Sequence, residues 1–169
     1  RYPGGKKQAV DITVLALKFH GTPRDERVAG TCIVIKKALP EITTVNEAFE
    51  AFAETYDVPR TVALKFNIVF DELLSNVISY AYTDDGDHDI EVRMERTGDR
   101  LTVTITDDGV PFNPLSVEKP DTALSLADRE VGKLGIHLVR KLVDDVSYHR
   151  RAGKNVMTLV RIFEDGDKN

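Results

Sequence analysis

The chain of 169 residues has one cysteine and no tryptophan, and it lacks any long run of apolar residues. A single cysteine, Cys32, excludes an internal disulfide and fits a reducing cytoplasm, the compartment that we expect. No apolar stretch approaches the about 20 residues that a membrane-spanning helix needs. The net charge of −5 argues against general nucleic-acid binding. We therefore expect neither a membrane nor a nucleic acid among its partners.

Hydrophobic residues make up 41% and charged residues 30% of the chain, which is ordinary for one globular domain. The sequence begins with Arg1 instead of methionine, so we expect it to be part of a longer protein. Residues 9–19 have the composition of a strand, residues 23–27 are typical of a linker, and residues 164–169 of a frayed, disordered tail.

Residues 66–82 have the apolar spacing of a helix with one buried stripe. Glu72 and Asn76 are four residues apart, so they lie one above the other on the flank of that stripe. Together they offer oxygen ligands for a hard cation and a carboxylate that can accept a proton. The alternative is a half-exposed helix edge with two solvated polar side chains.

Further elements are predicted on both sides of this helix. Residues 28–38 indicate a strand and residues 45–56 a helix capped by Thr43 or Thr44. Residues 146–150 and 155–163 indicate a hairpin near the end of the chain. Along its second strand, alternation places Thr158 on the same side as Val156, Val160 and Ile162, which predicts a polar group turned toward the core.

A second predicted hairpin, residues 89–96 and 100–107, ends in an acidic residue. In its second strand, Leu101, Val103 and Ile105 alternate with threonines, and the same alternation points Asp107 inward. A buried carboxylate needs a partner, and it can accept a hydrogen bond from an exocyclic amine such as that of adenine. The alternative is an aspartate that only starts the turn before Gly109.

A long polar connection, residues 110–131, precedes a glycine-containing helix start. It holds three prolines, and connections of this length are typically lids or disordered segments. Gly132 and Gly135 then open a helix that extends to about residue 143. Glycines at this position let backbone N–H groups approach a phosphate at the helix N-terminus. The alternative is an ordinary amphipathic helix that happens to begin with glycine.

The order of these motifs resembles that of the Bergerat-fold ATPases, the GHKL superfamily, over about residues 28–163. The segments ELLSNVISYAY, DDGVPFNP and VGKLGIHLVRKLVDDVSY, followed by GKNVMTLV, most closely resemble bacterial anti-sigma-factor serine/threonine kinases and their stand-alone regulatory relatives. The resemblance implies a two-layer α/β sandwich: a mixed, mostly antiparallel sheet carries about three helices on one face. ATP would lie between the helices and the lid.

The resemblance also implies roles for individual residues. Asn76 would ligate Mg²⁺, and Glu72 would orient or deprotonate the attacking hydroxyl or water. Asp107 would bind the amine of adenine, with Gly109 allowing the close turn and Thr158 assisting.

On the phosphate side, Gly132 and Gly135 would wrap the phosphates, and Leu134 between them belongs to the same cofactor-binding box. Arg129 stands where the family has a basic contact to the terminal phosphate. Two departures are visible. Pro111 replaces the second glycine that many members have after Gly109, and the glycine box lacks the extra glycine of sensor histidine kinases.

The implied function is an ATP- and Mg²⁺-dependent serine/threonine protein kinase that phosphorylates a small anti-sigma-antagonist protein. A sigma factor and a second copy of the chain are further candidate partners. The alternative is a nucleotide-binding regulatory module without catalysis, which controls an upstream phosphatase domain or sequesters a partner. The presence of Glu72 favours the enzyme. A sensor histidine kinase would need a phospho-acceptor helix in place of the strand and linker expected here.

Residues 1–22 weakly resemble the last strand of type 2C-like protein phosphatases, in which an acidic pair precedes Ile-Thr-Val. Of that pair only Asp11 is present, and Val10 occupies the other position. We expect these residues to be the tail of an upstream phosphatase-like domain in the same chain.

Overall fold

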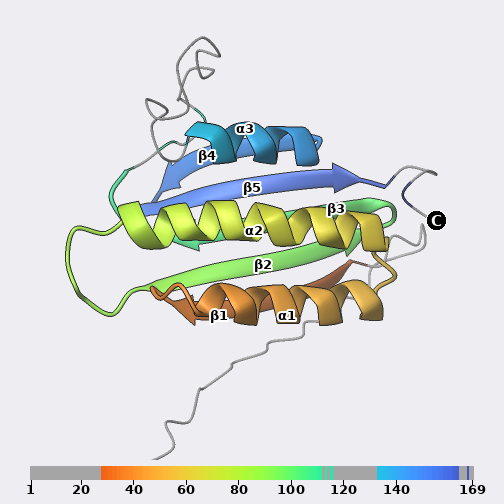
Figure 1. The fold of residues 1–169 in the computed structure, drawn as a ribbon, viewed down its shortest axis with the longest axis horizontal. Helices are drawn as coiled ribbons and strands as arrows, with labels where there is room; N and C mark the ends of the chain where they lie inside the picture. Colours follow the sequence, from red (N-terminus) through yellow and green to blue (C-terminus); the bar gives the residue numbers. More distant parts are fainter. Residues whose placement is uncertain (1–27, 112, 114, 116–132, 164–166, 168–169) are drawn as a thin grey trace, which may run out of the picture.

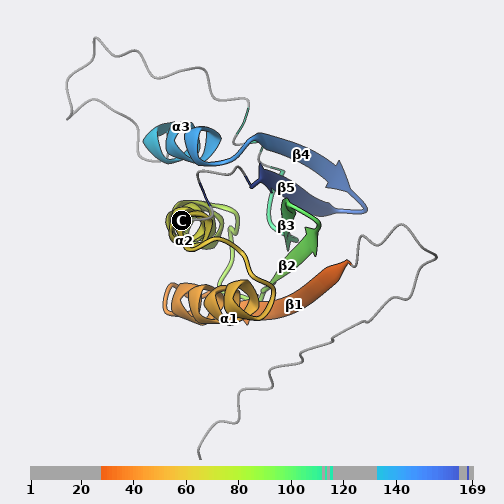
Figure 2. The same ribbon diagram turned by 90° about the vertical axis from the view of Figure 1, so that its right-hand side faces the viewer.

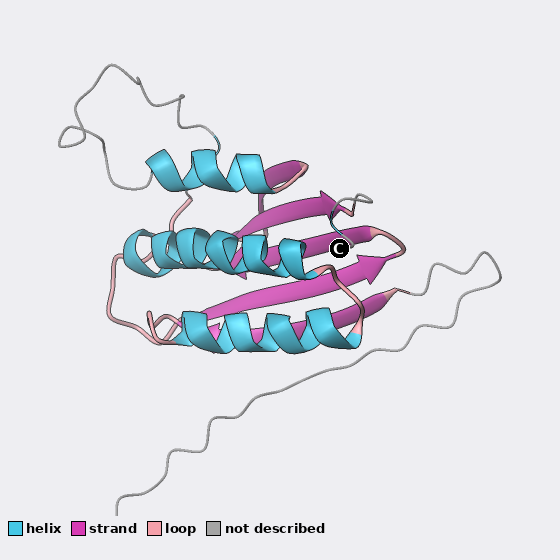
Figure 3. Cartoon of the chain, turned by 45° about the vertical axis from the view of Figure 1, so that its right-hand side comes forward, coloured by secondary structure: helices cyan, strands magenta, loops and turns pink. Residues whose placement is uncertain are grey.

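The computed structural model describes residues 28–111, 113, 115, 133–163 and 167. The expected strand at residues 9–19, the linker and most of the expected tail lie outside this set. The described elements are, in chain order, β1 (Ala29–Lys36), α1 (Glu41–Thr55), α2 (Arg60–Tyr80), β2 (Asp89–Thr97), β3 (Arg100–Asp107), α3 (Lys133–Leu142), β4 (Asp145–Arg151) and β5 (Lys154–Ile162). Figures 1 and 3 show their arrangement.

The described strands form one sheet in the order β1-β2-β3-β5-β4. Every pairing in it is antiparallel, whereas the sequence predicted a mixed, mostly antiparallel sheet. Both predicted hairpins, β2-β3 and β4-β5, are present. The pairing of β3 with β5 sets Asp107 directly opposite Asn155. Two polar residues far apart in the sequence are thereby placed at the same end of the sheet.

The three described helices lie on one face of the sheet, as the edge-on view in Figure 2 shows. The core is the layer between the helices and that face, and its largest fully buried side chains include Phe49, Phe66, Phe70, Ile90, Met94 and Leu159. The ring centroids of Phe49 and Phe70 are 5.2 Å apart in an edge-on contact that joins α1 to α2. This layered architecture confirms the predicted α/β sandwich.

Helix α2 follows the predicted apolar stripe. Phe66, Val69 and Phe70 are fully buried, and Pro59 precedes the first turn, where its missing N–H costs nothing. Helix α1 begins at Glu41, four residues before the predicted start, so the expected caps Thr43 and Thr44 lie inside it. Neither makes the cap, because Pro40 is the N-cap residue. Among the described helices none is both long and apolar enough to cross a membrane.

One residue of the expected tail is held in place. Asp167 is buried, and its carboxylate forms ion pairs with Lys65 at 3.3 Å and with Arg161 at 2.7 Å. Thr61 also donates a hydrogen bond to its backbone carbonyl. The chain end therefore contacts the first half of α2 at this residue, and the expectation of a frayed tail is wrong for Asp167.

Candidate functional site

A pocket lies between the second half of α2 and the sheet. It encloses about 460 Å³, including its open mouth. Most of its wall is apolar, with a few polar groups at one end, which is the usual composition of a small-molecule site. The lining residues are Leu73, Asn76, Val77, Ala81, Ile105, Asp107, Tyr148, Asn155 and Met157.

Asp107 is the buried acid of this pocket, with 5% of its surface exposed, which confirms the predicted inward direction. Its Oδ1 atom accepts hydrogen bonds from the Gly109 N–H at 2.9 Å and from Asn155 Nδ2 at 2.7 Å. Burial raises the pKa of this carboxyl above its usual value, and the two hydrogen bonds act in the opposite direction. Oδ2 makes no hydrogen bond to another described residue. It can therefore accept one from a ligand.

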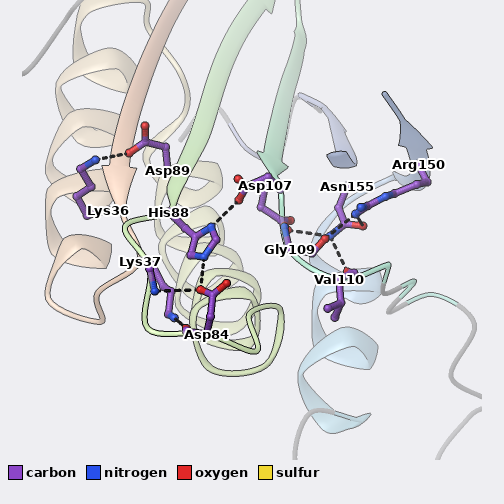
Figure 4. Close-up of polar contacts among 12 residues, drawn as sticks. Lys36, Lys37, Asp84, His88, Asp89, Asp107, Gly109, Val110, Arg150 and Asn155 are labelled. Atoms are coloured by element: carbon purple, nitrogen blue, oxygen red, sulfur yellow. Dashed lines mark hydrogen bonds and ion pairs between the residues drawn. The ribbon is translucent and has the colours of Figure 1, made fainter. Parts of the chain in front are cut away.

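Gly109 lets the turn after β3 approach the end of α2. A Cβ atom at this position would overlap the backbone carbonyl of Ala81. The N–H of Val110 donates to the same carbonyl at 2.7 Å. Asp107, Gly109 and Val110 are shown together in Figure 4. Glycine is required here because the backbone of the turn contacts the backbone of Ala81. The same turn holds the Asp107 carboxylate in place through the Gly109 N–H.

Two residues of the last hairpin, Tyr148 and Asn155, line the pocket, and Arg150 contacts Asn155. Asn155 donates through Nδ2 to Asp107 and, at 3.0 Å, to the carbonyl of Val110. Its Oδ1 atom accepts from the Tyr148 hydroxyl at 2.7 Å and from Arg150 at 2.8 Å. The sequence prediction missed all three. Asn155 alternates with Met157 and Leu159, and this pattern identifies it only together with the pairing of β3 and β5.

The prediction that Thr158 faces the core is wrong. Met157 and Leu159 are buried against the helices, so Thr158 between them points to the opposite face of the sheet. There it lies opposite Thr104 of β3. It does not line the pocket, and the polar group of β5 beside Asp107 is Asn155.

Glu72 and Asn76 stand one turn apart on the flank of α2, as predicted. Asn76 lines the pocket, and neither side chain forms a hydrogen bond with another described residue. The carboxylate of Glu72 packs on α3, where it fills the space that a Cβ of Gly135 would occupy. Gly135 thus admits an acidic side chain between the two helices. Two half-buried polar groups without protein partners in the described region are free to bind a ligand.

The remaining predicted residues lie near the start of α3. Leu134 is the second residue of that helix, whereas Gly132 and Arg129 fall outside the described residues. Of the expected lid, the structure describes residues 110, 111, 113 and 115. The guanidinium of Arg140 on α3 donates to the carbonyl of Leu115 at 2.8 Å. The first part of this connection therefore contacts α3.

A cluster around one histidine, His88, lies beside the turn that follows β3; we call it the histidine cluster. The ring of His88 bonds to Asp84 at 2.6 Å and to Asp108 at 3.1 Å, and it stacks on Tyr82 with the centroids 4.3 Å apart. The hydrogen bond with Asp84 is the main reason that the pKa of His88 is raised. Figure 4 shows His88 between this turn and the loop that follows α2. Sequence reasoning did not single it out.

The donor set fits a magnesium ion that arrives with a nucleotide. No group of three acidic, histidine or cysteine side chains in the described part of the chain could hold a metal alone. Mg²⁺ is commonly bound by one or two protein oxygens together with substrate phosphates and water. The carboxamide of Asn76, with Glu72 nearby, matches that smaller requirement.

The sequence of this chain is similar to those of known proteins. Residues 35–161 match the family model described as histidine kinase-like ATPase domain. The chain is 33% identical over 98 residues to the serine/threonine-protein kinase BtrW of Bordetella bronchiseptica, covering 57% of this chain and 69% of that protein.

Among solved structures, the chain is similar to the histidine kinase domain from the Erythrobacter litoralis EL346 blue-light activated histidine kinase. The identity is 18% and the TM-score 0.47, and the match covers 73% of this chain and 60% of the length of that one. Because the family match extends over residues 35–161, three quarters of the chain, this protein belongs to the histidine kinase-like ATPase domain family, in the GHKL superfamily that its motifs predicted.

Proposed function

We propose that this chain is an ATP- and Mg²⁺-dependent serine/threonine protein kinase domain of the anti-sigma-factor type. Its substrate would be a small regulatory protein of the anti-sigma-antagonist kind. Membership of an ATPase family and similarity to a protein named a serine/threonine kinase support this proposal. The observation that carries it is that Asn76 and Asp107 stand on two walls of one pocket, with Glu72 one turn before Asn76.

The pocket would hold the adenine base. The Oδ2 atom of Asp107 would accept a hydrogen bond from the 6-amino group, since Oδ1 is already engaged by the protein. Leu73, Ile105 and Met157 supply apolar walls for the flat faces of the base. An acceptor at the end of an apolar slot is the arrangement that a 6-aminopurine requires.

The phosphates would extend from the pocket toward Glu72 and α3. Mg²⁺ bound beside Asn76 would neutralise charge on the phosphates. The Glu72 carboxylate would take the proton of a substrate serine hydroxyl. The serine oxygen would bond to the terminal phosphorus as the bond from that phosphorus to ADP breaks. Gly132, Leu134 and Gly135 would contact the phosphates and Arg129 the terminal one. Phosphoryl transfer depends mainly on such positioning and charge neutralisation.

The test is transfer of label from γ-labelled ATP to candidate antagonist proteins from the source genome, with the modified side chain located by mass spectrometry. We expect Mg²⁺-dependent labelling of a serine or threonine. Chelation of Mg²⁺ should stop it, and Glu72→Gln should greatly reduce it. The matched control is Glu47→Gln, which changes an exposed glutamate of α1 and should leave the labelling unchanged. Tight ATP binding without transfer to any of these proteins would favour a nucleotide-binding regulatory module instead.

A further inference from the structure

The amide of Asn155 is fully occupied. A carboxamide has two N–H donors and two acceptor sites on its oxygen. Nδ2 donates to Asp107 Oδ1 and to the Val110 carbonyl, and Oδ1 accepts from Tyr148 and Arg150. Asn155 is 5% exposed, so these four bonds replace water.

The partners also fix which way this amide faces. An arginine can only donate, and it must therefore meet the amide oxygen. A carbonyl and an ionised carboxylate can only accept, so they must meet the nitrogen. Arg150 additionally donates to the Gly109 carbonyl at 2.7 Å, which ties the same arginine to the turn that carries Asp107. Figure 4 shows Arg150, Asn155 and Asp107 in line.

This inference rests on the proposed function, namely that the pocket takes a purine nucleotide. We propose that Arg150 and Tyr148 are positioning residues that make the pocket select a purine with a 6-amino group over one with a 6-oxo group. They do so by holding the Asn155 amide with its nitrogen toward Asp107. Asp107 then keeps its acceptor character, and its Oδ2 atom presents an acceptor to the base.

Loss of both donors would leave the oxygen of the Asn155 amide without a partner and loosen its hold on Asp107. Asp107 would then lose the charge of Arg150 and part of the hydrogen bond from Asn155, both of which favour its ionised form, so its carboxyl would be protonated more readily. The other charged or titratable groups that act on Asp107 are Asp108, which also favours the protonated form, and Tyr82. The Gly109 N–H would still donate to Oδ1, so the proton would lie on Oδ2, where it can be donated to the 6-oxo group of hypoxanthine. The preference between the two bases would shrink.

The experiment measures binding of ATP and of inosine triphosphate, which carries a 6-oxo group, by titration calorimetry across pH. The parent should prefer ATP by about 10- to 150-fold, the range for a hydrogen bond to a charged group. The double variant Tyr148→Phe/Arg150→Met should bring this ratio close to one. It should also move the acid limb of ATP affinity to higher pH. Arg150→Lys, which keeps a donor, should retain most of the preference.

The matched control is Arg151→Met. Arg151 is exposed and, one position along β4, lies on the opposite face of the sheet. It should keep the parent's ratio. If the double variant does not fold, Arg150→Met alone carries the same comparison, because it removes the partner that can only donate, whereas the remaining Tyr148 hydroxyl can also accept.

Equal weakening of both nucleotides in the variant, with an unchanged ratio and acid limb, would overturn the proposal and leave a merely structural network. A parent that binds both nucleotides equally well would overturn the proposal but not ATP binding. A parent that binds neither would overturn the proposed function and this inference with it.

Discussion

The variant Asp107→Asn changes one oxygen of the buried carboxylate into an amide nitrogen with almost no change in shape. Because Oδ1 accepts from Gly109 and Asn155, the new amide should keep its oxygen there and place its NH₂ group where Oδ2 lay. That group would face the 6-amino group of adenine, donor against donor. Losing a hydrogen bond to a charged group costs about 1.5–3 kcal/mol, so the dissociation constant for ATP should rise by about 10- to 150-fold.

The same variant should fold almost as well as the parent. Burial holds the pKa of Asp107 above its unfolded value. A carboxyl with a raised pKa contributes stability that is fully present below the unfolded pKa and is lost as the pH rises through the folded one. At neutral pH the ionised form of Asp107 therefore does not stabilise the fold, and replacing it by asparagine should cost little stability.

The assays are titration calorimetry with ATP and denaturant unfolding of each protein. The control is Asp145→Asn, an exposed aspartate at the start of β4, which should change neither quantity. ATP affinity equal to that of the parent in Asp107→Asn would refute the assignment of the adenine contact. A large loss of stability with unchanged affinity would show that Asp107 serves the fold alone.

Three other predictions concern the helices and the histidine cluster. Asn76→Ala should abolish Mg²⁺-dependent nucleotide binding and keep the helix, since alanine is the better helix former. Calorimetry with and without Mg²⁺ checks this prediction. An affinity for Mg-ATP equal to that of the parent would mean that Asn76 is only a surface amide. Gly135→Ala should displace the Glu72 carboxylate and lower phosphoryl transfer while circular dichroism shows unchanged folding, and full activity would contradict the contact. The raised pKa of His88, held mainly by Asp84, means that its stabilising contribution is present at low pH and is lost as the pH rises through the folded pKa. His88→Gln should therefore lower the melting temperature more at about pH 5 than at about pH 8, and a loss equal at both pH values would be the contrary result.

Local patterns were sufficient to predict several features of the fold. The apolar residues of α2 recur at three- and four-residue steps, so their period identified both the helix and its buried face, although Leu64 and Ile68 are apolar and exposed. In β3, threonines separate the apolar residues, and this strict alternation predicted correctly that the side chain of Asp107 points inward. The E-x-x-x-N spacing placed Glu72 and Asn76 on one flank of α2, because side chains four residues apart share a helix face.

Strand β5 could not be oriented in the same way. Val156, Val160 and Ile162 on one face are as apolar as Met157 and Leu159 on the other, so alternation did not decide which set is buried. The wrong choice carried Thr158 inward and left Asn155 unnoticed. The register between β3 and β5, which pairs Asp107 with Asn155, decides the matter.

Contacts between distant parts of the chain were also beyond local reasoning. The bond between Asn155 and Asp107 spans 48 positions, and that between Thr61 and Asp167 spans 106. Neither partner carries a local signal for the other. Such pairs become visible only when the sheet order is known.

The most direct test of kinase function is a paired measurement on Glu72→Gln. Glu72 stands one turn before Asn76. Under the proposed function its carboxylate would lie near the terminal phosphate, where it would accept a proton but repel the bound nucleotide. We predict that ATP affinity is kept or improved, while phosphoryl transfer to the partner protein falls by about 10²- to 10⁴-fold. Transfer at the parental rate by Glu72→Gln would contradict the account.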